Sequence, residues 1–156
     1  MPEVHVLLGS KSDAPVAEAL ASVLKELGVS YKIQVASAHR TPERVAEIVR
    51  ASDAKVFVGI AGVSCALPGA IAALTVRPVI GVPVSGKVNL DAILSAVQMP
   101  PGVPVAAVGL DRGENAGILA AQILAVANPA LQKRLEERRV AAAKKVVADS
   151  ADVERL

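Results

Sequence analysis

One turn of this chain carries an imidazole directly beside a guanidinium. Residues 37–42 read SAHRTP after an apolar run, so that His39, one of only two histidines, is followed by Arg40 and by a helix start at Pro42. An imidazole moves protons near neutral pH, while a guanidinium and a helix N-terminus both favour an anion. These residue types therefore indicate a site that binds an anion and moves a proton.

A second polar loop, residues 9–13 (GSKSD), lies between another apolar run and a helix pattern. Gly9 permits close approach of the backbone, and Ser10 and Ser12 offer hydroxyl donors. Asp13 can accept hydrogen bonds from ribose hydroxyls, and the helix start that follows favours an anion. The loop is neither a Walker phosphate loop nor a dinucleotide fingerprint, so a cluster that only caps the helix is an equal alternative.

A third loop, residues 61–69 (AGVSCALPG), is built from small residues that let a planar ligand approach the backbone, and Ser64 offers one hydrogen bond there. Cys65 is interpreted as a buried thiol rather than a nucleophile, because no histidine lies near it in sequence to activate it. His5 lies inside an apolar run and is interpreted as structural. Because the two histidines and the one cysteine are widely spaced, we expect no metal site.

Short apolar runs alternate with helical patterns along the chain. The predicted strands are residues 4–8, 31–36, 55–60, 79–82 and 103–110. The predicted helices are residues 15–27, 42 onward, 68–74, 91–98, 114–127 and about 129–148. Thr41 and Asp91 are expected to be the N-caps of two of them. The alternation predicts an α/β fold, a doubly wound parallel sheet with helices on both faces and a long C-terminal helix. Such sheets bind ligands at the carboxyl ends of their strands, where the three polar loops fall.

Length and composition predict one domain over residues 1–156 with an aliphatic core. The hydrophobic share is 53%, and the aromatic residues are one tyrosine and one phenylalanine. That share exceeds what a disordered chain carries, and the scarcity of aromatics excludes stacked binding of single-stranded nucleic acid. The net charge is +2 and the charges near the C-terminus form a mixed run, typical of a solvated helix face. We therefore expect no nucleic-acid partner.

The same numbers carry expectations about location and assembly. No apolar run approaches ~18 residues, so no membrane span is expected. A single cysteine fits a reducing, cytoplasmic location. The surplus of apolar residues predicts that part of the surface is buried in a homo-oligomer.

Taken together, the motifs resemble the PurE family of purine biosynthesis. The matching segments are residues 9–13, 37–42, 61–62, 67–69, 78–84, 97–100 and 115–124, so that the resemblance runs from about residue 4 to residue 138. It implies a flavodoxin-like domain that assembles as an octamer. It also implies an enzyme that forms 4-carboxy-5-aminoimidazole ribonucleotide without an organic cofactor or metal.

The resemblance also implies roles for individual residues. His39 would be the general acid/base and Arg40 the ligand of the substrate phosphate, while Ser10 and Asp13 would bind the ribose-phosphate part. These roles suit an imidazole and a guanidinium chemically. The predicted substrate-binding residues are Gly9, Ser10, Ser12, Asp13, Ser37, Ala38, Arg40, Gly62, Ser64 and Leu67.

Members of the PurE family fall into two classes, and this chain resembles both. Mutases move a carboxylate from the exocyclic amine of N5-carboxyaminoimidazole ribonucleotide to a ring carbon, whereas the other class adds carbon dioxide directly to aminoimidazole ribonucleotide. Mutases usually carry a histidine where this chain has Ala66, and the direct carboxylases tend to carry serine and alanine in this loop. Arg40 and the segments 67–69 and 97–100 resemble the mutases.

We expect the mutase reaction, with direct carboxylation as the alternative. A non-catalytic nucleotide-binding paralogue is a further alternative, motivated by Ala66, and the presence of His39 and Arg40 weighs against it.

Overall fold

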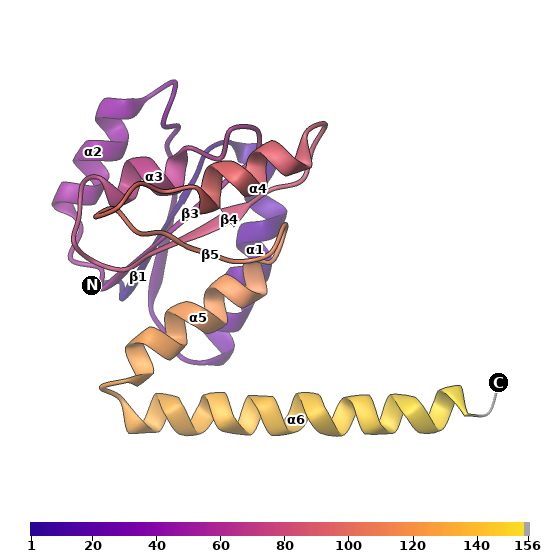
Figure 1. Ribbon diagram of the computed structural model, residues 1–156. Coiled ribbons are helices and arrows are strands. Elements are labelled where there is room, and N and C mark those ends of the chain that lie inside the picture. The colour runs from indigo at the N-terminus through magenta and orange to yellow at the C-terminus, as the bar shows by residue number, and fades with distance from the viewer. Residues whose placement is uncertain (155–156) are drawn as a thin grey trace.

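A five-stranded parallel sheet forms the centre of the protein in the computed structural model, which describes residues 1–154 (Figure 1). The strands are β1 (Val4–Leu8), β2 (Tyr31–Val35), β3 (Val56–Ala61), β4 (Val79–Pro83) and β5 (Ala106–Ala107). They lie in the order β2-β1-β3-β4-β5, and every neighbouring pair is parallel. This is the flavodoxin-like order, whose direction of winding reverses between β1 and β3. The predicted fold class is confirmed.

Helices cover both faces of the sheet, as a parallel sheet requires. They are α1 (Ala14–Glu26), α2 (Pro42–Ala51), α3 (Leu67–Ala72), α4 (Asn89–Val97), α5 (Gly113–Ala125) and α6 (Pro129–Val153), with a short 3-10 turn at Lys11–Asp13 before α1. One buried cluster joins α1 and α5 to the sheet, and a second joins α2, α3 and α4 to the other face. No helix within residues 1–154 is long and apolar enough to cross a membrane.

Successive side chains of the inner strands point to opposite faces of the sheet, and both faces are covered by helices. These strands are therefore apolar along most of their length. In β1, Val4, Val6 and Leu8 pack towards α1 and α5, whereas Leu7 packs towards the opposite layer. The α1 and α5 backbones approach closely because α5 carries Gly113 there: a Cβ at this position would collide with the carbonyl oxygen of Val16. This close packing anchors α1, and with it the loop that precedes α1.

Two strands differ from the predictions. The segment 103–110 was expected to be a strand, but only Ala106 and Ala107 pair with β4. Pro104, which has no N–H to donate, lies just before this pair, so the ladder is short. Strand β2 lies at the edge of the sheet, and none of its five residues is fully buried, contrary to the expectation of a buried strand.

Of the two predicted helix caps, Thr41 is confirmed by position and Asp91 is wrong, and α6 is longer than predicted. Asp91 lies inside α4, whose N-cap position is occupied by Val88. Thr41 occupies the N-cap position of α2 but its side chain makes no capping hydrogen bond; it bonds Ser37 instead, as described below. Helix α6 continues to Val153, five residues past the predicted end.

Candidate active site

A cavity of about 370 Å³ lies at the carboxyl ends of β1, β2 and β3, where the order of the sheet reverses. This is the position at which open parallel sheets bind ligands. The cavity brings together all eleven residues selected from the sequence: Gly9, Ser10, Ser12, Asp13, Ser37, Ala38, His39, Arg40, Gly62, Ser64 and Leu67. Its lining also includes Ala61, Val63 and Ala66.

The loop after β1 is fixed by a reciprocal pair of hydrogen bonds. The backbone N–H of Ser12 donates to Ser10 Oγ over 3.3 Å, and the N–H of Ser10 donates to Asp13 Oδ2 over 2.8 Å. This capping box starts the helical turn, and the Ser12 hydroxyl donates to Ser10 Oγ over 3.0 Å. The capping role of this loop is confirmed, and the residues that cap the helical turn also line the cavity.

The Asp13 carboxyl is buried, and this burial raises its pKa above the ordinary value. Hydrogen bonds from Ser10 and Ser12 and the positive charge of Arg40 act in the opposite direction. A buried carboxyl that lines the cavity is a fixed acceptor rather than a solvated surface charge.

The turn after β2 is closed by its own side chains. The N–H of Ser37 donates to Thr41 Oγ1 over 2.9 Å, and the N–H of Thr41 donates to the Ser37 carbonyl over 2.9 Å. Thr41 therefore closes the turn instead of capping α2, a pairing whose only sequence signal is the spacing of two hydroxyl residues four apart. The closed turn leaves His39 and Arg40 exposed at the cavity.

Arg40 links the two loops across the cavity. Its Nη2 donates to the carbonyl oxygen of Gly9 over 2.8 Å, and its Nε lies 3.4 Å from Ser37 Oγ. The guanidinium of this cavity-lining residue is thus held at the end of β1, and a guanidinium suits a bidentate contact to an anion. Sequence inspection did not find this link, because the two residues are 31 positions apart.

The third loop places small side chains along the remaining wall. Ser64 adopts a left-handed backbone with φ of 47°, uncommon for a residue other than glycine. Cys65 is fully buried beside it, with Sγ 3.9 Å from the Val82 carbonyl. Burial raises the pKa of the Cys65 thiol to about 11, so the thiol is neutral at physiological pH. The interpretation of Cys65 as a buried thiol is confirmed.

The cavity therefore combines a guanidinium, an imidazole and a buried carboxyl with a wall of small residues. Such a set can hold an anion, accept hydrogen bonds from hydroxyls and transfer a proton. Within residues 1–154, no group of three His, Cys, Asp or Glu residues is arranged to hold a metal ion.

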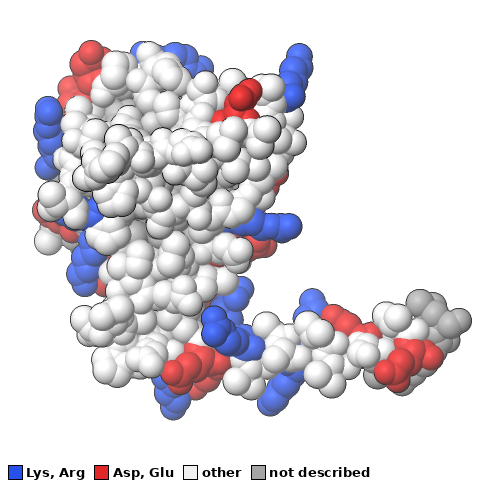
Figure 2. All heavy atoms as spheres, viewed as in Figure 1, with Lys and Arg blue, Asp and Glu red and all other residues white. Residues whose placement is uncertain are grey.

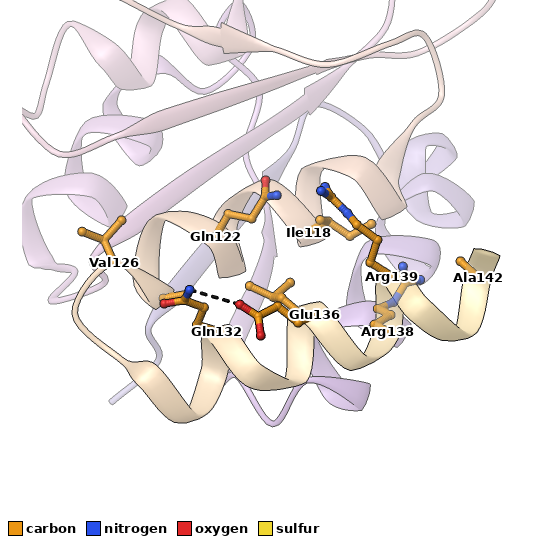
Figure 3. Close-up of a pocket in the computed structure, with 10 residues that line it drawn as sticks. Ile118, Gln122, Val126, Gln132, Glu136, Arg138, Arg139 and Ala142 are labelled. Carbon is orange, nitrogen blue, oxygen red and sulfur yellow. Dashed lines mark hydrogen bonds between the residues drawn. The ribbon is translucent and has the colours of Figure 1, made fainter. Parts of the chain in front are cut away.

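A second hollow, of about 440 Å³, lies between α5 and α6 and differs in kind (Figure 3). Its lining comes from the facing sides of two helices and includes Ile118, Gln122, Leu135 and Arg139. It contains no imidazole and lies outside the strand ends. We therefore assign the chemistry to the cavity at the strand ends.

Comparison with known proteins identifies the family. The family model described as AIR carboxylase matches residues 3–145. The N5-carboxyaminoimidazole ribonucleotide mutase of Methanocaldococcus jannaschii is 53% identical over 98% of both chains, and that of Pyrococcus abyssi is 46% identical over 89% of this chain and 83% of its own. The crystal structure of Treponema denticola PurE matches with a TM-score of 0.88 and 32% identity, over 97% of this chain and 98% of its own. The chain belongs to the AIR carboxylase family, also called the PurE family.

Proposed function

We propose that the protein converts N5-carboxyaminoimidazole ribonucleotide into 4-carboxy-5-aminoimidazole ribonucleotide, the mutase reaction of purine biosynthesis. The observation that carries this proposal is the joint placement of His39 and Arg40 in one cavity at the ends of β1 and β2. Family membership, and relatives that are named for this mutase, support it.

The balance of the reaction suits a single imidazole. A carbon–nitrogen bond breaks at the exocyclic amine and a carbon–carbon bond forms at the ring. One proton leaves the ring carbon and one proton joins the amine nitrogen, so the net reaction is an isomerisation. His39, the one imidazole among the residues that line the cavity, can accept the first proton and return the second.

The other lining residues are assigned by their chemistry. Arg40 binds the substrate phosphate, and the capping-box residues Ser10 and Asp13 bind the ribose hydroxyls. Gly62, Ser64 and Leu67, with the backbone close to the surface, form the wall against the imidazole ring of the substrate and its carboxylate. Excluding water there protects carbon dioxide if the carboxylate is released before it is transferred.

Direct carboxylation of aminoimidazole ribonucleotide by carbon dioxide, a lyase-type reaction, is the second candidate. It is favoured by one observation: Ser64 and Ala66 line the cavity in the loop where mutases usually carry a histidine.

A spectroscopic assay separates the two reactions. We expect the purified protein to convert N5-carboxyaminoimidazole ribonucleotide without added bicarbonate, and to leave aminoimidazole ribonucleotide with bicarbonate unconverted on the same time scale. The His39→Asn variant provides the blank for uncatalysed decay of the substrate. Turnover of the second mixture alone would replace the mutase by the carboxylase, and turnover of neither would reject both.

We further propose that the chain acts as a homo-oligomer, an octamer, in the cytoplasm, and that a second copy covers the groove between α5 and α6. Helix α6 packs on the body at its beginning through Leu131 and Leu135 and bonds Glu26 through Arg138 over 3.3 Å. Beyond that point it projects away from the sheet (Figure 1). The projecting part exposes several valines: Val140, Val146, Val147 and Val153. An unsupported helix end of this length is marginal in water.

Charge along α6 supports the α6 of a second copy as the occupant. Residues 138–145 carry four basic side chains, whereas the C-terminal end of the helix carries the acidic residues Asp149 and Glu154. Figure 2 shows blue and red patches along the projecting helix. Arg138 and Arg139 line the groove (Figure 3). An antiparallel α6 from a second copy places its acidic end against these arginines and buries valines from both copies.

We expect replacement of Val146 and Val147 by glutamate to break this assembly. The side chains are exposed in the single chain, so the variant should still fold, as far-UV circular dichroism would show. It should lose native mass, because two charges would enter an apolar contact. Light scattering should give a multiple of 15.9 kDa for the wild type and a smaller multiple for the variant. The matched control is Val76→Glu, an exposed valine outside the groove. A monomeric wild type, or an unchanged mass of the variant, contradicts the proposed contact.

A further inference from the structure

The second histidine of the chain is buried at the opposite end of the sheet from the active-site cavity. His5, in β1, is 3% exposed. Its Nε2 lies 2.9 Å from Oε1 of Gln34 in β2, and its Nδ1 lies 2.8 Å from Oγ of Ser52, the residue that follows α2. We call these three residues the His5 clasp. One imidazole thus bonds β1 to the edge strand β2 and to the end of α2.

The partners fix the protonation of His5. Because the Gln34 oxygen can only accept, Nε2 carries the proton, and the Ser52 hydroxyl donates to Nδ1. Ser52 Oγ also accepts from the N–H of Ala54 over 3.2 Å. The ring stacks on Phe57 with centroids 5.9 Å apart and planes 17° from parallel. Both ring nitrogens are therefore occupied, and burial, which lowers the pKa of His5, favours the neutral ring.

The clasp lies at the base of the unit that carries the active-site turn. Strand β2, residues 36–41 and α2 are continuous, so Gln34 and Ser52 stand on either side of that turn in the chain. This unit has few other anchors: β2 has no fully buried residue, and α2 buries only Val45 and Val49. Besides the clasp, its position depends on the β1–β2 ladder, on the two valines with the partly buried Ile33 and Ile48, and on the bond from Arg40 to Gly9.

We propose that His5 is a positioning residue for the reaction, which holds β2 and the end of α2 together so that the turn between them presents His39 and Arg40 to the cavity. The inference rests on the proposed function only for its kinetic consequence. It goes beyond that function because it assigns a role to a residue that touches neither the cavity nor the substrate.

Protonation of His5 should weaken the clasp. Burial lowers the pKa of His5, with a contribution from the positive charge of Lys32 on β2, while the bond to Gln34 acts in the opposite direction. Arg77, whose guanidinium lies 5.9 Å from the Phe57 ring and donates to the Ser52 and Ala54 carbonyls, adds a further positive charge nearby. On the other side, Glu47 of α2 and Asp53 line the adjacent hollow as acidic groups.

The sign of the pH effect follows from this shift. In the unfolded chain His5 has an ordinary pKa near 6.5, so below that pH the unfolded state binds the proton first. Folding stability from the clasp is therefore complete above about pH 6.5 and is lost as the pH falls towards the lowered pKa. Thermal unfolding between pH 7.5 and 5 should show this loss in the wild type and a smaller loss in a His5→Phe variant.

The test compares a variant of the clasp with a core variant on the other face of the sheet. His5→Phe keeps a ring against Phe57 but removes both hydrogen bonds, and we expect a KM about tenfold higher, with faster amide hydrogen exchange across residues 36–41. The control is Val23→Ala, which opens a cavity under α1 on the other face of the sheet. At a temperature well below both melting points the control should keep the wild-type KM and the wild-type exchange at that turn.

Each outcome decides the inference. Equal KM values for His5→Phe and wild type, or an equal rise in Val23→Ala, would overturn it. If His5→Phe does not fold, Ser52→Ala, which removes one of the two bonds, should move exchange and KM in the same direction by a smaller factor, and no movement there rejects the clasp. Amide exchange at residues 36–41 can be measured without turnover. If His5→Phe shows faster exchange there but the wild type has no detectable activity, the proposed function is refuted and the clasp is retained.

Discussion

Replacing His39 by asparagine lowers kcat on N5-carboxyaminoimidazole ribonucleotide by about 10²- to 10⁴-fold, the usual contribution of a positioned acid/base, while the substrate dissociation constant stays within about threefold. Asparagine cannot carry a proton between the ring carbon and the amine. It leaves the turn intact, because the turn is closed by bonds between Ser37 and Thr41 rather than by the imidazole. Single-turnover rates and calorimetric binding measure the two quantities separately.

The control for this variant is Ser12→Ala, which removes a polar group from the same cavity without a proposed part in proton transfer. Its rate should fall far less. A His39→Asn enzyme that keeps its rate within about threefold would remove the imidazole from the reaction. A rise in the dissociation constant as large as the loss of rate would make His39 a binding residue and not the acid/base.

Much of the fold was predictable because the signals are local. Runs such as Val4–Leu8 are apolar on both faces, which in a chain this short points to strands covered by helices on both sides. The three polar loops follow three of the predicted strands. Once the strands are parallel, their carboxyl ends meet at one edge of the sheet, and the eleven selected residues share a cavity as a consequence of topology.

The features that escaped prediction depend on contacts between distant segments. Arg40 reaches the Gly9 carbonyl only because β2 pairs with β1 in one register, in which Leu8 lies opposite Val35. The partners of His5 are set in the same way, since Gln34 and Ser52 lie 29 and 47 residues along the chain. Thr41 is a residue type that favours the N-cap position, but its hydroxyl oxygen accepts from the backbone N–H of Ser37 instead of from the helix.

Replacing Arg40 by alanine raises the dissociation constant of aminoimidazole ribonucleotide by about 30- to 150-fold. This factor corresponds to about 2–3 kcal/mol, the range for hydrogen bonds to a charged group. The value lies below that of a fully buried ion pair because the guanidinium is exposed in the free protein. The dissociation constant of Arg40→Lys should lie between those of Arg40→Ala and the wild type, because an ammonium keeps the positive charge but cannot form the bidentate hydrogen bonds of a guanidinium. Titration calorimetry at fixed ionic strength gives the three constants.

The matched control is Arg44→Ala, which removes the same charge one turn along α2, where the side chain lies outside the cavity and donates to the Val35 carbonyl over 3.4 Å. If only general charge mattered, both variants would weaken binding equally. We expect the loss to be confined to Arg40, because the bonds to Gly9 and Ser37 hold its guanidinium in place before the substrate arrives and so lower the entropic cost of the contact. Raising the salt concentration should weaken wild-type binding more than Arg40→Ala binding, since the screened contact is already absent there. An unchanged affinity of Arg40→Ala would place the phosphate elsewhere in the cavity.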